Sequence, residues 1–158
     1  MLSVSKTKPS NSRQLISPVL AGICLTLMLI LHLLFPIVAL IPFPFDLTGL
    51  LVSGLGLTIC FVAHRQFKKV GTTLYPFSQP GKLVTGGLFR YTRNPMYLGL
   101  TVFLTGIWLL LGSLTPGIFV AAFVLIADRC YIAYEEKQLL TVFGAAYAAY
   151  QSRTPRWI

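Results

Sequence analysis

Residues 93–136 read RNPMYLGLTVFLTGIWLLLGSLTPGIFVAAFVLIADRCYIAYEE, two long apolar runs joined by a short turn. Met96–Leu111 and Ile118–Tyr134 are close to the length of about 17–25 residues that a helix needs to cross a bilayer. Gly112–Gly117 supplies the Gly, Ser, Thr and Pro residues typical of a turn. Because the charged residues stand toward its two ends, the stretch predicts a helical hairpin in a membrane.

Two more apolar segments precede this hairpin. Leu15–Ile41 predicts a first span, with Pro36, Pro42 and Pro44 breaking the helix near its end. Leu47–Ala63 predicts a second span. We therefore expect an all-α membrane protein with four transmembrane helices. Its parts are a cytoplasmic tail at 1–14, helices 1–2 at 15–63, and a core at 64–158 with a loop at 71–95, two more transmembrane helices and a C-terminal amphipathic helix.

Composition supports a membrane location. Hydrophobic residues make up 55% of the chain and charged residues 11%, and the mean hydropathy is +0.74. A soluble domain carries about 25% charged residues. The formal charge of +9 does not indicate a nucleic-acid partner, because the basic residues stand outside the apolar runs or at their edges.

The distribution of basic residues predicts the topology. With four spans and the N-terminus inside, the turns at 41–47 and 112–117 face outward, and neither contains Lys or Arg. All thirteen basic residues then lie on the cytoplasmic side, as the positive-inside rule requires. We expect an integral protein of a bacterial inner membrane with both termini in the cytoplasm and the lipid bilayer as its partner.

The segment at 71–95 is long for a loop in so small a protein, and such loops are often functional. Gly86 and Gly87 let a ligand approach the backbone closely, and Asn94-Pro95 stiffens the start of the third span. Arg90 and Arg93 stand three residues apart among aromatics. The alternative interpretation is an ordinary interfacial belt in which arginines contact lipid headgroups.

A second polar segment begins within the last part of the fourth span and continues beyond it. Three of the four acids of the chain, Asp128, Glu135 and Glu136, fall within nine residues. On a regular helix, residues seven apart share a face, so Asp128 is predicted above Glu135 and Arg129 above Glu136. An ionisable residue in a membrane span indicates a functional site. The alternatives are a helix-holding ion pair and, for the two glutamates, a solvated helix exit.

Cysteine usage points away from metal chemistry. Cys24, Cys60 and Cys130 are far apart in sequence and have no CxxC spacing, so we predict small buried hydrophobes and no metal site. Gly144 is placed to end the last long helix, and a further short helix is predicted at 145–150.

The two polar segments together resemble the C-terminal half of the isoprenylcysteine carboxyl methyltransferases and the related membrane phospholipid methyltransferases. The resemblance covers roughly residues 65–158 in consistent order. It is carried by residues 71–73, 83–91, 93–99, 135–139, Phe143-Gly144, Tyr147, Tyr150 and Pro155-Arg156. Asn94 stands where the eukaryotic isoprenylcysteine enzymes have His, and Tyr131 where they have a substrate-binding Arg. These departures concern the acceptor more than the methyl donor.

The resemblance implies S-adenosylmethionine as cofactor, held at the cytoplasmic ends of the last spans. Residues 64–158 would then form a methyltransferase-like core. The cofactor-binding residues that it implies are Gly81, Lys82, Leu83, Val84, Phe89, Asn94, Pro95, Met96, Tyr97 and Glu135. The residues predicted to act in catalysis are Glu135, Arg129 and Glu136.

The predicted function is therefore methyl transfer to a lipid-like or hydrophobic acceptor that enters from the bilayer, without nucleic acid or metal. Two alternatives stay open at this point. One is a membrane reductase of the sterol-reductase kind that uses NADPH, and the other is a membrane scaffold without turnover.

Overall fold

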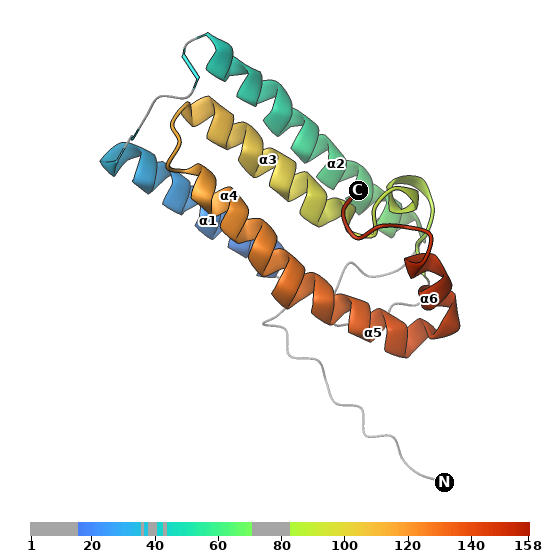
Figure 1. Cartoon of the computed structure of the whole chain (residues 1–158). Coiled ribbons are helices and arrows are strands. Elements are labelled where there is room, and N and C mark those ends of the chain that lie inside the picture. Colours follow the sequence, from blue (N-terminus) through green and yellow to red (C-terminus); the bar gives the residue numbers. More distant parts are fainter. Residues whose placement is uncertain (1–15, 36, 38–40, 43, 71–82) are drawn as a thin grey trace.

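The computed structural model describes the chain except for residues 1–15, 36, 38–40, 43 and 71–82. The described part is helical and contains no β-strand. Figure 1 shows the long helices lying side by side, with the chain's last two helices beyond one end. In order, the elements are α1 (Ile16–Leu34), η2 (Phe45–Leu47), α2 (Thr48–Val70), η3 (Gly87–Arg90), α3 (Pro95–Leu111), α4 (Gly117–Ile126), η4 (Ala127–Ile132), α5 (Ala133–Phe143) and α6 (Ala145–Gln151).

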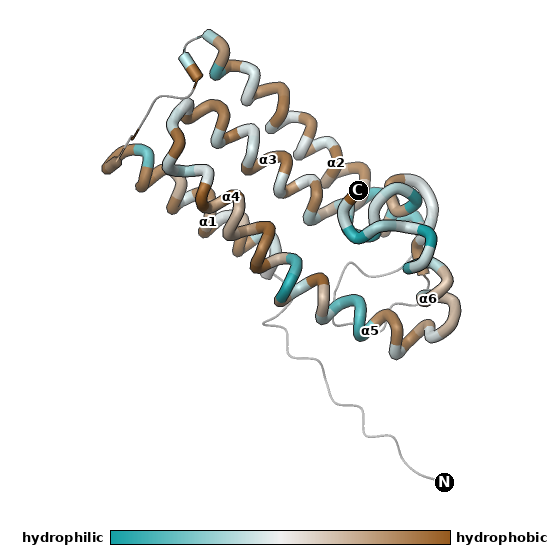
Figure 2. Tube along the Cα trace, in the orientation of Figure 1, coloured by the Kyte–Doolittle hydropathy of each residue, from teal (hydrophilic) through white to brown (hydrophobic). Residues whose placement is uncertain are grey.

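Three segments within the described residues are long and apolar enough to cross a membrane: Ser17–Leu34, Phe45–Lys69 and Gly117–Phe143. The third predicted span forms the shorter apolar helix Pro95–Leu111. Large hydrophobic side chains on α1, α2 and α4 are exposed, including Leu33, Leu51 and Ile118. In Figure 2 the hydrophobic colour follows the long helices, whereas hydrophilic residues gather where η3, α5 and α6 lie. We call this the polar end.

The helix boundaries differ from the sequence-based ones at two places. The described α1 ends at Leu34 rather than near residue 41, because Pro36 removes a backbone donor and disfavours a helical residue before it. In the other direction, α2 runs on to residue 70, beyond the predicted end at 63. The predicted end at 63 was placed where the apolar stretch ends. The largely polar residues 64–70 continue the helix beyond it.

α3 is the central helix. On one side it packs along α2, and on the other it contacts α1 and α4. The buried cluster between α1, α3 and α4 includes Met28, Leu104 and Phe123. At the end opposite the polar end, His32 Nδ1 lies 2.8 Å from Ser113 Oγ, which joins α1 to the turn between α3 and α4 by a hydrogen bond.

The α2–α3 interface depends on small residues. In lipid, helices gain little from apolar burial against each other, so close backbone packing carries the association. A Cβ on Gly56 would lie 2.6 Å from the carbonyl oxygen of Gly99 and 2.8 Å from Cα of Phe103. Both are backbone atoms that cannot move aside without separating the helices.

Gly56→Ala is therefore expected to lower the free energy of unfolding by about 1–3 kcal/mol, the range of an overpacked core. Gly54→Ala is the matched control, since a Cβ there meets nothing within 4 Å. It should be neutral or stabilise by up to about 1 kcal/mol, because alanine favours helix. SDS titration of the detergent-solubilised variants measures both. Equal stability of the two variants would contradict the packing argument.

A π-helical segment interrupts the fourth helix. Residues 127–132 form η4 between α4 and α5, and π-helical hydrogen bonding adds about one residue to a turn. The predicted register is therefore wrong: Asp128 shares its partner Arg156 with Glu136, eight residues on, and Glu135 bonds elsewhere. Cys130, predicted to be buried, is exposed, whereas Cys24 is buried.

The C-terminal part follows the prediction. α5 ends at Phe143, and Gly144 has a φ of 51°, a backbone conformation that glycine adopts readily. α6 then turns back toward α2 and α3 at the polar end, as Figure 1 shows. The predicted N-terminal tail at 1–14 and residues 71–82 of the predicted loop lie outside the described residues.

Candidate functional site

A cavity opens at the polar end, between segments far apart in sequence. The space between its lining side chains is about 540 Å³ when its open mouth is included. It is lined from α2 by Phe67, from the segment before α3 by Leu83, Val84, Phe89, Arg93 and Asn94, from α5 by Glu135, Glu136 and Leu139, and from α6 by Tyr147 and Tyr150.

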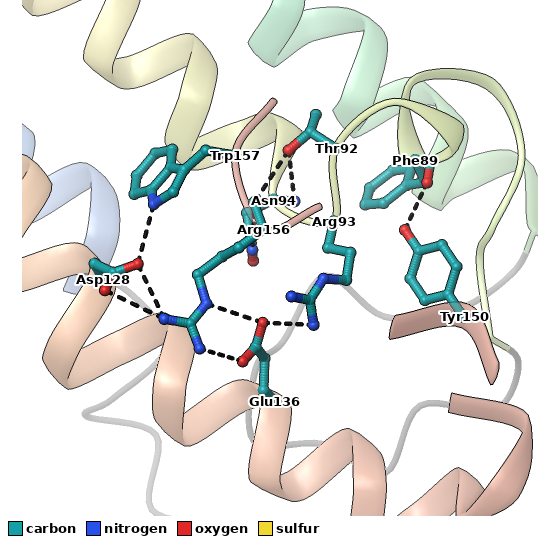
Figure 3. Close-up of polar contacts among 9 residues, drawn as sticks. All are labelled: Phe89, Thr92, Arg93, Asn94, Asp128, Glu136, Tyr150, Arg156 and Trp157. Atoms are coloured by element: carbon teal, nitrogen blue, oxygen red, sulfur yellow. Dashed lines mark hydrogen bonds and ion pairs between the residues drawn. The ribbon is translucent and has the colours of Figure 1, made fainter. Parts of the chain in front are cut away.

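Aromatic side chains hold one wall of this cavity in place. Phe89 packs edge-on against Phe67, with ring centroids 4.9 Å apart. The hydroxyl of Tyr150 donates to the carbonyl oxygen of Phe89 at 2.6 Å, a contact visible in Figure 3. Gln66 Oε1 accepts from the backbone N–H of Leu88 at 3.2 Å. α2, η3 and α6 are thereby joined into one wall.

Glu135 stands at the inner side of the cavity. Its Oε1 accepts a hydrogen bond of 2.7 Å from the hydroxyl of Tyr97 in α3. Tyr97 is buried in the apolar cluster between α1, α3 and α4 and does not line the cavity. The pair therefore connects the apolar interior of the helices to the cavity, and it joins the two polar segments singled out from the sequence.

Glu136 belongs to a different group of contacts. It accepts from Arg156 Nε at 3.1 Å and from Arg156 Nη2 at 2.5 Å, and Arg93 Nη1 lies 2.8 Å from its Oε1. Arg156 Nη1 also donates to both carboxylate oxygens of Asp128, at 3.1 and 3.2 Å. Figure 3 shows the guanidinium of Arg156 between the two carboxylates.

The segment around Arg156 is fixed by its backbone as well. Its carbonyl oxygen accepts from Thr92 Oγ1 at 3.2 Å and from Asn94 Nδ2 at 3.1 Å, while the N–H of Arg93 donates to the carbonyl of Pro155. Trp157 Nε1 donates to Asp128 Oδ1 at 3.0 Å. Residues 155–157 thus tie the 92–94 segment to η4 and α5, and we call this set of contacts the Arg156 network.

The electrostatic effects follow from these contacts. Hydrogen bonds to Glu136 raise the pKa of Arg156, so the guanidinium stays charged. Burial raises the pKa of Tyr147, with a further rise from Glu136 and an opposing effect of Arg93. Burial also raises the pKa of Tyr150. Both tyrosines are therefore neutral hydrogen-bonding groups at the cavity.

The predicted site residues divide into those at the cavity and those away from it. Leu83, Val84, Phe89, Asn94, Glu135 and Glu136 line it, whereas Pro95, Met96 and Tyr97 lie behind its wall at the start of α3. Arg129 points away, with a side chain 82% exposed and 3.6 Å from Asp128. Gly81 and Lys82 lie outside the described residues.

Sequence reasoning did not assign Phe67, Arg93, Leu139, Tyr147, Tyr150 or Arg156 to the site. Four of these residues, Arg93, Tyr147, Tyr150 and Arg156, stood in the stretches that carry the family resemblance. The sequence therefore marked them, but it gave them no role in the site. Phe67 and Leu139 have apolar side chains of common type, and no local pattern distinguishes them. Within the described residues, no three His, Cys, Asp or Glu side chains gather as a metal site.

Comparison with protein-family models shows the family of the chain. The model of the phospholipid methyltransferase family matches residues 45–146, which include α2, α3, α4, η4 and α5. The chain belongs to this family. No curated protein and no solved structure gave a match.

Membership shows that the chain is a membrane methyltransferase in type, consistent with its long apolar helices. The match ends at residue 146, so Tyr147, Tyr150, Arg156 and Trp157 lie beyond it. These four residues nevertheless complete the cavity and the Arg156 network of this phospholipid methyltransferase family member.

Proposed function

We propose that this chain transfers a methyl group from S-adenosylmethionine to a lipid-like or hydrophobic acceptor. The observation that carries the proposal is the cavity at the polar end, where Glu135 and the 83–94 segment meet. In the sequence these segments are separated by the whole α3–α4 hairpin. The family membership independently supports methyl transfer as the reaction type.

The lining suits a nucleoside with a charged amino-acid part. Phe67, Phe89 and Tyr147 offer aromatic surfaces for a purine, and the carboxylate of Glu135 can accept hydrogen bonds from ribose hydroxyls. A carboxylate also favours a nearby sulfonium through its charge. The cavity thus presents both apolar and anionic groups, as a sulfonium nucleoside requires.

The donor supplies a methyl group already activated on sulfur, so the protein's contribution is alignment and exclusion of water. Glu135, fixed by Tyr97, is the residue we place in contact with the reactants. Glu136 acts by positioning Arg93 and Arg156. Arg129, which lies outside the cavity, would contact lipid headgroups instead.

The proposal includes the topology. Four helices cross the membrane, with Pro95–Leu111 as the shortest, and the polar end faces the cytoplasm of a bacterial cell. The basic residues of the sequence support this orientation, because α2 ends in Lys68 and Lys69 at the same end as the cavity. The acceptor would reach Glu135 laterally from the inner leaflet.

Titration of the purified protein in lipid nanodiscs tests the proposal. We expect saturable binding of S-adenosylhomocysteine and none of NADPH, measured by calorimetry with empty nanodiscs as control. Binding of NADPH in place of S-adenosylhomocysteine would support a reductase, and binding of neither would support a scaffold without turnover. Either result would overturn the proposed function.

A further inference from the structure

Arg93 is a cation at the cavity wall that the sequence analysis did not assign to the site. It lies in the segment before α3, and its side chain is 12% exposed. It lines the cavity together with Glu135 and Tyr147. A guanidinium this deeply buried rarely lacks hydrogen-bond partners. Its contacts within the protein therefore show which of its N–H groups a ligand would have to satisfy.

The partners of Arg93 leave part of its guanidinium unused. Nη1 lies 2.8 Å from Glu136 Oε1, yet the alignment is not that of a hydrogen bond, and Nε has no acceptor; both nitrogens are buried. Glu136 is already engaged by two hydrogen bonds from Arg156. Arg93 therefore receives charge compensation from Glu136 and also hydrogen-bonds Tyr147, while the buried N–H of its Nε has no acceptor and is left for a ligand.

A buried donor without an acceptor costs about 1–3 kcal/mol, and more when the group is charged. Arginine presents its N–H groups as a planar fork that matches a carboxylate in two parallel hydrogen bonds. We infer that Arg93 binds the carboxylate of the amino-acid part of the methyl donor. This inference rests on the proposed function and adds a specific subsite to it.

The other charges at the cavity favour a carboxylate over a phosphate. Glu135 and Glu136 both line the same space, so a dianionic phosphate would meet two like charges. A ligand with one carboxylate and cationic groups meets complementary partners: Arg93 for the carboxylate and Glu135 for the cationic part. Arg93 and Glu135, the latter oriented by its hydrogen bond from Tyr97, thus give the cavity wall one cation and one anion to match that mixed charge.

The test uses two ligands that differ only in the carboxylate: S-adenosylhomocysteine and its decarboxylated analogue. In the wild-type protein the carboxylate should strengthen binding about 10- to 100-fold, as expected for a charge-assisted bidentate contact. Arg93→Gln should remove this preference by weakening S-adenosylhomocysteine while leaving the analogue unchanged. Arg93→Lys, which keeps the charge without the fork, should retain part of it.

Arg90→Gln is the matched control, because Arg90 is an exposed arginine three residues away that does not line the cavity. It should keep the wild-type preference. Unchanged binding of the analogue by Arg93→Gln also shows that the variant is folded. Equal wild-type affinity for the two ligands, or equal weakening of both by Arg93→Gln, would overturn the inference while leaving the proposed function intact. Failure of the wild-type protein to bind either ligand would overturn both.

Discussion

Arg156→Gln is expected to lower the free energy of unfolding by about 2–4 kcal/mol. The substitution leaves Glu136, which is 8% exposed, with Arg93 alone, and it removes two hydrogen bonds from Asp128. Breaking a buried ion pair by removing one partner costs about 3–5 kcal/mol, and the figure is reduced here because the Arg156 side chain is 33% exposed. Asp128 in η4 and Glu136 in α5 lose their common partner at once.

Arg153→Gln is the control for this variant. Arg153 is exposed and donates one hydrogen bond, from Nε to the carbonyl of Ala149 at 3.0 Å. Its loss should cost less than about 1 kcal/mol. SDS titration of both variants in the same detergent gives the comparison. If Arg156→Gln were no more destabilising than Arg153→Gln, the Arg156 network would not be a structural element of the protein.

Much of the helical framework could be predicted from the sequence, because long apolar runs, and the Gly, Pro and polar residues that end them, are local signals. The hairpin at 93–136 and the end of the long helix at Gly144 are observed as expected. Boundaries set by hydropathy were less secure. The end of α2 moved from 63 to 70 because polar residues form helix as readily as apolar ones outside a membrane.

The register of the acids could not be predicted, because nothing in ADRCYI marks a π-helix. An assumed regular period placed Asp128 with Glu135 and Arg129 with Glu136. The added residue of η4 instead brings Asp128 and Glu136 to the same arginine and leaves Arg129 exposed. A π-helical segment is less stable than a regular α-helix and persists where tertiary contacts stabilise it. The Arg156 network supplies such contacts here.

The site was predictable in its location and only partly in its members. Both polar segments were singled out from the sequence. In the structure, the Tyr97 hydroxyl lies 2.7 Å from Glu135 Oε1 across the hairpin. The partners of Arg93 and Arg156 were not predictable, because they come from segments up to 64 residues away, as with Thr92 and Arg156. The charge of a buried side chain indicates that it needs a partner of opposite charge. It does not identify the residue that the fold brings next to it.

Glu135→Gln is expected to weaken binding of S-adenosylhomocysteine at least about 100-fold while leaving stability within about 1 kcal/mol of wild type. The amide oxygen of glutamine can still accept from the Tyr97 hydroxyl, so the contact of 2.7 Å that holds α3 to α5 has a replacement. What the variant loses is a carboxylate facing the cavity. A hydrogen bond to a charged group contributes about 1.5–3 kcal/mol, and loss of attraction to the ligand's cationic part adds to it.

The adjacent acid provides the contrasting variant. Glu136→Gln removes the charge that Arg93 and Arg156 share, so it should destabilise the protein by about 2–3 kcal/mol. Of the two isosteric changes, one residue apart, only Glu136→Gln is therefore expected to lower the free energy of unfolding by this amount. Calorimetric titration and SDS unfolding of both variants separate the two roles. If Glu135→Gln bound the ligand normally, or if it unfolded as easily as Glu136→Gln, then Glu135 would belong to the framework of the protein, and the assignment of this cavity to the methyl donor would lose its central contact.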